Sequence, residues 1–455
     1  MVRRSNQALA ALLVAGLVSC GAGPDGGASA RRVVLVTCDT LRADHLGAYG
    51  APEGATPALD AFAERALVFE RAFASAPLTC PALSTVMTGR LPDELGMGSN
   101  KVLLPAAAET LAEVISAAGI RTHAIVSNWV LRMRDDATVS LSQGFLTYDD
   151  EFDAVEPNRP KVLERRAKST TDAALAWLAE HDAERFFLWV HYQDPHGPYT
   201  PPAPYVRWSP TEGEAHLPVG KTQIGLGEIP QYQFLEDETR PSFYRARYEG
   251  EIRYFDHELG RLLEALADSP GTLVVITADH GESLGEHDYW FSHGQSLYAE
   301  LLHVPLLIHG PGVRSGRATS LVGHIDILPT ILGALGLEAP ANHGTDLLGE
   351  LPTDRIVPAQ VRRPGAPDRW QSVTGERWRL VVSAKGQMLF DLDADPGELR
   401  DLAPSNHELV QSLASRAEAM LEELAPLGER AQAEVLSAED HSRLGALGYG
   451  GTSSE

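Results

Sequence analysis

Cysteine is scarce in this chain of 455 residues, which contains only three. Three cysteines cannot build a disulfide scaffold or a cysteine-rich zinc site. Basic residues are also few, because 38 lysines and arginines face 62 aspartates and glutamates, giving a formal charge of −24. Such an acidic protein is a poor partner for a phosphate backbone, and we expect no nucleic-acid binding. The hydrophobic share of 44% is ordinary and predicts a globular protein with a large core.

The N-terminal segment has the features of a targeting signal. The apolar run Ala8–Val18 follows two arginines and is too short to span a bilayer as a folded helix. It runs into Leu17–Gly21, which resembles the bacterial lipoprotein cleavage box, where the cysteine (here Cys20) is acylated and becomes the first mature residue. The alternative is an ordinary secretory signal with an unrelated cysteine. We predict a lipoprotein signal peptide over 1–19 and a flexible tether over 20–31, which is rich in Gly, Ala and Pro.

The predicted location follows from this signal. The mature protein would be a lipoprotein of the cell envelope, facing the periplasm or the cell surface. It would contact the membrane through its lipid anchor only, since Cys20 is the single predicted lipidation site.

Apolar runs alternate with helical patterns along most of the chain. The runs expected to form buried strands are Arg32–Thr37, Thr122–Ser127, Phe186–Tyr192, Leu273–Thr277 and Val304–His309. The helical patterns are Pro57–Arg65, Glu109–Ala118, Arg165–His181 and Tyr244–Leu266. This alternation predicts an α/β fold, a doubly wound and mostly parallel sheet with helices on both faces.

The sequence pattern changes in the last hundred residues. Two strand-like runs, Arg379–Ser383 and Met388–Leu392, flank a short polar turn and predict a hairpin. Acidic helical sequence follows, from Asn406 to about Ala433. The predicted division is a large α/β domain over 32–350 and a small C-terminal domain of antiparallel strands and helices over 351–455.

Polar side chains collect where the predicted strands end. The clusters are Cys38–Thr40, Asp194–His196, Asp279–Glu282 and Ser292–Gly294. Each alone could be a helix cap or a surface histidine, but ligands of doubly wound sheets bind outside the carboxyl ends of the strands. Carboxylates with imidazoles at one such edge suit a divalent cation, and oxygen ligands leave Zn, Mn, Mg and Ca all open.

A candidate nucleophile, Thr79, lies in the stretch Ser75–Gly89. Ala82–Met87 can form a helix that ends near Gly89. Thr79 would then lie just before the helix N-terminus, where free N–H groups and the macrodipole favour an oxyanion such as phosphate or sulfate. The alternative is that Thr79 is only an N-cap, and these residues alone leave the two interpretations nearly balanced.

Several longer motifs resemble the sulfatase family of the alkaline phosphatase superfamily, in the same order and from about residue 32 to the end. They are Asp39–Gly47, Thr56–Asp60, Phe187–Tyr199, Thr277–His287, Val304–Leu306, Asp326–Thr330 and Leu389–Leu392. The resemblance implies an alkaline-phosphatase-like α/β domain followed by a small C-terminal sheet domain. It also implies an ester hydrolase whose substrate is a small-molecule, glycan or lipid ester.

The resemblance assigns a metal site residue by residue. Asp39, Asp279 and His280 resemble the family's ligands to one divalent cation. Thr79 falls at the nucleophile position, which in the family also touches the metal.

Two histidines resemble residues that handle the ester. His196 resembles the histidine that contacts the ester or leaving-group oxygen, and His293 lies roughly where the family places Lys or His near the transferred group. We expect Asp194 to be structural, although a two-metal arrangement would recruit it with His196 and His293 and leaves a second cation open.

Three departures separate this chain from sulfatases proper. In those, a Cys or Ser at the nucleophile position is oxidised to formylglycine and an arginine follows four residues later; here these positions hold Thr79 and Leu83. Thr40 stands where another metal-binding Asp is usual, and Ser127–Trp129 lacks the family's lysine. A second register would use Cys80, but it lies one residue too close to the Thr-Gly that follows.

The departures affect the expected reaction. Threonine cannot become an aldehyde, and sulfate release from a formylglycine hydrate breaks a C–O bond in a way that a threonyl sulfate cannot. Water can instead cleave a threonyl phosphate at phosphorus, so Thr79 favours a phosphodiester or phosphonate over a sulfate ester within metal-assisted covalent hydrolysis. The alternative function is a non-catalytic, lipid-anchored binding protein that keeps the sulfatase fold.

Overall fold

The computed structural model describes residues 30–133, 140–221, 224–267, 269–362, 369–424 and 426–427. The predicted signal peptide, Cys20, most of the tether and the last part of the predicted acidic helices lie outside the described residues. Those expectations therefore stay predictions.

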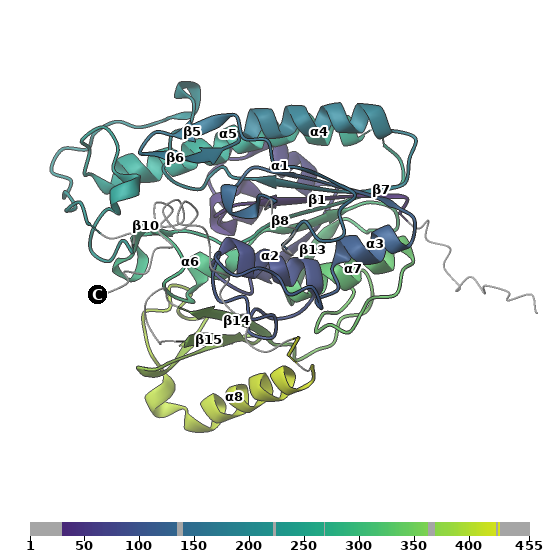
Figure 1. Ribbon diagram of the computed structural model, residues 1–455. Helices are drawn as coiled ribbons and strands as arrows, with labels where there is room; N and C mark the ends of the chain where they lie inside the picture. The colour runs from purple at the N-terminus through teal and green to yellow at the C-terminus, as the bar shows by residue number, and fades with distance from the viewer. Residues whose placement is uncertain are drawn as a thin grey trace, which may run out of the picture.

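Nine strands form one mixed sheet at the centre of the molecule (Figure 1). Eight follow the order β11-β2-β12-β8-β1-β7-β3-β4, and β13 pairs with β2. Their bounds are β1 Arg32–Cys38, β2 Leu67–Phe73, β3 Arg121–Val126, β4 Thr147–Asp149, β7 Phe186–Tyr192, β8 Thr272–Ala278, β11 His303–Val304, β12 Leu306–His309 and β13 Gly316–Gly323. The run from β8 through β1, β7 and β3 to β4 is parallel. All seven residues of β7 and all seven of β8 are buried, as expected of parallel strands covered on both faces.

Helices cover both faces of this sheet, which confirms the predicted doubly wound fold. Figure 1 shows α1, α4 and α5 on one face and α2, α3 and α7 on the other. Their bounds are α1 Pro57–Ala63, α2 Thr79–Thr88, α3 Leu111–Ala117, α4 Ala167–His181, α5 Pro241–Ala267 and α7 Ile327–Leu335. The four helices expected from periodicity match α1, α3, α4 and α5 to within three residues at each end.

The expectation of one strand over Val304–His309 is wrong. Pro305 has no N–H to donate, and the run divides there into β11 and β12. β12 is also antiparallel to both of its neighbours, β8 and β2. The sheet is therefore mixed on this side and parallel through its centre.

A second, four-stranded antiparallel sheet forms the C-terminal part of the chain. Its strands are β14 Val357–Arg362, β15 Arg369–Thr374, β16 Trp378–Ser383 and β17 Gly386–Asp391. The helix α8 (His407–Glu422) packs against β15 and β16. The predicted hairpin is confirmed as β16–β17, whereas a domain boundary at residue 350 stays a prediction.

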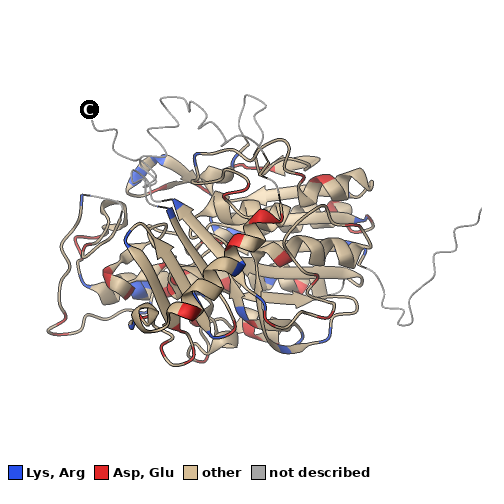
Figure 2. Cartoon of the chain, turned by 90° about the horizontal axis from the view of Figure 1, so that it is seen from below, with Lys and Arg blue, Asp and Glu red and all other residues tan. Residues whose placement is uncertain are grey.

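The described part of the chain contains no helix long and apolar enough to cross a membrane. In the view of Figure 2, basic and acidic residues are interspersed over the described elements, and no single basic stretch stands out there.

Candidate active site

Two aspartates lie side by side at the carboxyl end of the parallel sheet. Cys38 of β1 pairs with Ala278 of β8, so the residues that follow, Asp39 and Asp279, leave the sheet at the same level. The Asp279 N–H donates to the Cys38 carbonyl at 3.2 Å, which continues the ladder by one residue. Register alone therefore brings both carboxylates to one point of the sheet edge.

His280 completes a group of three potential metal ligands with these aspartates. One atom from each of the three residues lies within 4.8 Å of the other two, and all three residues are buried. His280 Nδ1 lies 2.9 Å from the Gly281 carbonyl, so Nδ1 carries the proton and Nε2 keeps its lone pair. Asp39 Oδ1, Asp279 Oδ2 and His280 Nε2 are buried without a hydrogen-bond partner. Orphaned carboxylate and imidazole atoms around one point fit a divalent cation.

The charge state of the group agrees with this interpretation. Burial raises the pKa of Asp279 well above its ordinary value, and the neighbouring Asp39 carboxylate raises it further. Burial acts in the same direction on Asp39, but His196, His191 and His280 outweigh it and lower the pKa of that carboxyl. Burial also lowers the pKa of His280 to about 3, so the imidazole is neutral and able to coordinate. A cation is the natural counter-charge for this pair of buried carboxyls.

Two residues that the sequence did not single out hold Asp39 in place. The Asn128 side-chain amide donates to Asp39 Oδ2 at 2.5 Å. His191 Nε2 lies 3.8 Å from the same oxygen, and its Nδ1 is 2.8 Å from Thr37 Oγ1. His191 lies near the end of β7, the neighbour of β1, and Asn128 follows β3, the next strand in the sheet. Both side chains therefore reach Asp39 from the same side of β1. A histidine inside an otherwise apolar strand was the available signal.

Thr40 follows Asp39 in a strained backbone conformation. Its φ is 55°, which is rare for a β-branched residue. The conformation is fixed from two sides, because the Thr40 N–H donates to Asp279 Oδ1 at 3.1 Å and its carbonyl accepts from the Tyr248 hydroxyl at 2.7 Å. Strain that the surroundings enforce is common where a backbone turns through a functional site.

Thr79 is the first residue of α2, which corrects the expectation that it precedes the helix or caps it. The N-cap is Leu78, and no side chain caps the helix. The backbone donors expected for an anion are also fewer, because Cys80 N–H donates to Asn100 Oδ1 at 2.8 Å and Pro81 has no N–H. The predicted helix end is confirmed, since Gly89 closes α2 with a φ of 64°.

The residues on either side of Thr79 contact two segments that lie next to the metal-ligand group. Its Oγ1 is fully buried without a hydrogen-bond partner. On one side, the Cys80 thiol approaches the carbonyl of Val130, two residues after Asn128. On the other, a Cβ added to Gly294 would meet the Leu78 side chain at 2.8 Å, so the residue before Thr79 packs beside the residue after His293.

His196 and His293 form a second cluster beside the metal-ligand group. The centroid of the His293 ring lies 5.2 Å from that of His196 and 4.6 Å from that of His280. His293 Nδ1 lies 3.2 Å from Glu282 Oε1, whereas His196 Nδ1 has no hydrogen-bond partner. Burial lowers the pKa of both histidines, to about 4 for His293. The structure thus brings Asp39, Asp279, His280, His196 and His293 together.

Glu282, to which the sequence analysis gave no role of its own, also belongs to this cluster. Burial raises the pKa of Glu282 to about 8, and the nearby His196 opposes that rise. The Tyr199 hydroxyl lies next to the carboxyl and also opposes the rise in the pKa of Glu282. Its position two residues after His280 was the available signal.

Asp194 has the structural role that we expected. Its Oδ2 accepts the Ala167 N–H at the start of α4 at 2.9 Å, and its Oδ1 lies 3.3 Å from Arg166 Nε. Among the described residues, Asp39, Asp279 and His280 form the one close group of three such ligands.

Cys38 and Cys80 are both buried and neither forms a disulfide, although an oxidising compartment would permit one between them. The Cys38 thiol donates to the Asp194 carbonyl at 3.0 Å. We expect neither thiol to react with an aromatic disulfide reagent in the native protein and both to react after unfolding in guanidinium. Titration of native and unfolded samples checks this, and a Cys38–Cys80 disulfide would instead leave no free thiol from this pair.

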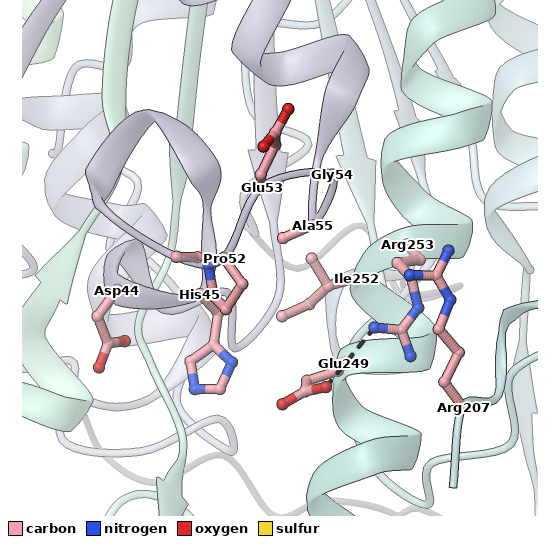
Figure 3. A pocket seen from close by; sticks show the side chains of 11 residues that line it. Asp44, His45, Pro52, Glu53, Gly54, Ala55, Arg207, Glu249, Ile252 and Arg253 are labelled. Carbon is pink, nitrogen blue, oxygen red and sulfur yellow. Dashed lines mark ion pairs between the residues drawn. The ribbon is translucent and has the colours of Figure 1, made fainter.

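A separate cavity of about 300 Å³ lies between the segment Asp44–Ala55 and the helix α5 (Figure 3). Arg207 and Arg253 form one wall and Asp44 and His45 the opposite wall. It contains none of the metal-ligand or histidine groups described above. Carboxylates and guanidinium groups both line it, so its charge selects neither anions nor cations.

Two aspartates and a histidine are buried together at the carboxyl edge of a doubly wound sheet, and a small antiparallel sheet follows in the chain. This combination is that of an alkaline-phosphatase-like hydrolase. The sulfatase family model, described as "Sulfatase", matches residues 31–337, and the chain therefore belongs to the sulfatase family.

The relatives agree with this assignment. The chain is 25% identical over 438 aligned residues to the Delta 4,5-hexuronate-2-O-sulfatase of Bacteroides thetaiotaomicron, covering 85% of this chain and 87% of that protein. The phosphonate monoester hydrolase of Agrobacterium radiobacter has the same fold, with a TM-score of 0.69 at 21% identity, over 89% of this chain and 98% of that one. A protein solved with its substrate D-glucosamine-2-N,6-O-disulfate gives a TM-score of 0.71 at 16% identity, over 88% and 100%. The chain is a sulfatase-family ester hydrolase.

Proposed function

We propose that this protein is a metal-dependent hydrolase that cleaves phosphodiester or phosphonate esters through a covalent intermediate on Thr79. The observation that carries the proposal is the buried Thr79 hydroxyl, which has no hydrogen-bond partner. The residues on either side of Thr79 pack against the segment that contains Asn128 and the segment that contains His293. Thr85 of the same helix is also buried without a partner, so the feature that distinguishes Thr79 is its place at the first turn of α2, next to residues that pack beside the Asn128 and His293 segments.

Asp39, Asp279, His280 and the Thr79 hydroxyl would hold the cation. When bound, a divalent cation lowers the pKa of a coordinated hydroxyl and neutralises charge that develops on the transferred group. The fixed hydrogen bond from Asn128 orients Asp39, and the Gly281 carbonyl fixes the tautomer of His280. The ligand set admits Ca, Mn, Zn or Mg.

His196 and His293 would handle the leaving oxygen. Both are largely shielded from water, because His196 is 5% exposed and the side chain of His293 is 6% exposed. The contact between His293 Nδ1 and Glu282 fixes the ring, which directs Nε2 away from Glu282. A neutral imidazole near a leaving alkoxide can donate a hydrogen bond or relay a proton.

The identity of the nucleophile favours phosphorus over sulfur. A threonyl ester has no aldehyde hydrate from which sulfate could be expelled, so only attack on the central atom can free the enzyme. The Agrobacterium phosphonate monoester hydrolase has the same fold at 21% identity, so this fold accommodates phosphonate chemistry. Sulfate esters, on which other relatives act, are the second candidate substrates.

A side-by-side activity panel tests the substrate class. Purified protein is assayed at saturating Mn²⁺ with four p-nitrophenyl substrates. They are a sulfate, a phosphomonoester, a phenylphosphonate and a phosphodiester. We expect the phosphonate and the phosphodiester to be cleaved fastest. Faster cleavage of the aryl sulfate than of both would contradict the preference for phosphorus.

The non-catalytic alternative is not favoured. A binding protein that had lost the chemistry would have no reason to keep orphaned ligand atoms on Asp39, Asp279 and His280, because each is costly to bury unsatisfied. Their retention around one point is better explained by a cation.

We also propose that the protein is anchored through Cys20 in the cell envelope. Cys20→Ser removes the acylated thiol, so we expect the protein to leave the membrane fraction or to keep its signal peptide. Fractionation followed by immunoblotting measures both, with Cys80→Ser as the control that should stay membrane-bound. Normal processing and unchanged membrane association of Cys20→Ser would contradict the anchor.

A further inference from the structure

The short helix α6 (Ala299–Leu302) connects the two chain segments that carry the candidate catalytic groups. The Leu301 carbonyl accepts the Gly281 N–H at 2.8 Å, one residue after His280. The next carbonyl, that of Leu302, accepts the Ala74 N–H at 2.8 Å, at the start of the segment that leads to Thr79. The position of α6 therefore fixes the metal-ligand segment relative to the nucleophile segment.

The contact between α6 and the metal-ligand segment is too close for a side chain. A Cβ added to Gly281 would lie 2.0 Å from the Glu300 carbonyl oxygen. Only glycine permits this approach, and a shift of α6 would be transmitted directly to the residue after His280.

The C-terminal domain supplies the group that holds the start of α6. Glu398 Oε2, just beyond β17, accepts the Ala299 N–H at 2.5 Å. Arg379 of β16 donates to both oxygens of Glu398, at 3.1 and 3.2 Å. The two side chains are 0% and 1% exposed, so this ion pair is fully enclosed.

Further contacts fix the ion pair and the segment around it. Arg379 Nε donates to Thr374 Oγ1 at 3.0 Å, and its guanidinium lies 4.8 Å from the ring centroid of Phe73 in β2. Tyr298, directly before α6, has its ring centroid 5.9 Å from that of Phe390 in β17. The C-terminal domain thus contacts α6 through a charged group and an aromatic group.

We propose that Arg379 and Glu398 are positioning residues, through which the C-terminal domain sets α6 and thereby the geometry of the metal site. The inference rests on the proposed metal site of Asp39, Asp279 and His280. The C-terminal domain then has a part in metal binding although none of the three candidate ligands belongs to it.

A calorimetric titration of Mn²⁺ into the metal-free, full-length protein tests this inference without any substrate. Two variants break the contact in different ways. The double substitution Arg379→Met with Glu398→Met removes the ion pair without leaving one charge buried alone. Ala299→Pro removes the N–H donor and places a ring carbon against the Glu398 carboxylate, at the first helical position where proline is tolerated and after a residue, Tyr298, already extended with a ψ of 168°.

We expect both variants to bind Mn²⁺ at least about tenfold more weakly than the wild type, because metal affinity falls by about that factor when the ligands are no longer held in place. Glu398→Gln keeps an acceptor for the Ala299 N–H, so it should bind Mn²⁺ more tightly than these two variants, although the buried Arg379 charge left without its carboxylate should lower its Tm. Arg377→Met is the matched control, because Arg377 pairs with Asp391 in the same domain but its side chain is 52% exposed. Its Mn²⁺ affinity should not change.

Thermal unfolding of the metal-free proteins separates positioning from general loss of stability. In both variants we expect cooperative unfolding without metal and a smaller rise in Tm on adding Mn²⁺. Wild-type Mn²⁺ affinity in Ala299→Pro and in the double variant would overturn the inference. A wild-type protein that binds no Mn²⁺ or other divalent cation would overturn the proposed metal site instead.

Discussion

Thr79→Ala should lower turnover of a phosphonate or phosphodiester substrate by about 10³-fold or more, because it removes the nucleophile of a covalent mechanism. The fold should survive, since Thr79 Oγ1 makes no hydrogen bond that would be lost. Steady-state kinetics together with circular dichroism of the purified variant measures both effects.

The same helix provides a matched control for this substitution. Thr85 also lies in α2, is fully buried, and has a hydroxyl without a hydrogen-bond partner. Thr85→Ala should therefore cause a similar small loss of stability and leave turnover close to the wild-type rate. Thr79→Ser keeps a hydroxyl and should recover much of the activity. Equal turnover in Thr79→Ala and Thr85→Ala would contradict the assignment of the nucleophile.

Asp279→Asn should abolish tight binding of a divalent cation and, with it, turnover. The substitution removes one of the two carboxylate ligands of a buried group, and a neutral amide cannot compensate the charge of the cation. Elemental analysis after exhaustive dialysis measures the bound metal directly, and added metal should not restore the wild-type rate.

Asp149→Asn is the control for Asp279. Asp149 ends β4 of the same sheet and pairs with Arg165 at 2.5 Å, outside the metal-ligand group. It should keep its metal and most of its activity. Full metal content in Asp279→Asn would show that this carboxylate is not a ligand.

The position of the metal-ligand group could be predicted because it follows from strand order and register. β1 and β8 are mostly apolar and almost fully buried, and each is followed directly by an aspartate. The resemblance to sulfatases supplied the assignment of these two residues as ligands, and the parallel pairing of β1 with β8 places them together.

The supporting residues could not be predicted because they depend on contacts between distant segments. Asn128 reaches Asp39 across 89 positions of sequence, and neither residue type nor local spacing indicates that contact. The same holds for Glu398, which reaches Ala299 from the second domain. Thr79 was expected just before the helix, with an N-cap as the alternative, and both were wrong because Leu78 takes the extended N-cap conformation and α2 begins at Thr79, three residues before Ala82.

The most direct test of the account is a mass spectrum of the peptide around Thr79 after rapid acid quenching of the enzyme during turnover of a phosphonate or phosphodiester. We predict a substrate-derived phosphoryl or phosphonyl group on Thr79, absent from the Thr79→Ala enzyme and from unreacted protein. An aldehyde at Cys80, or turnover that leaves Thr79 unmodified while another residue carries the adduct, would contradict the account.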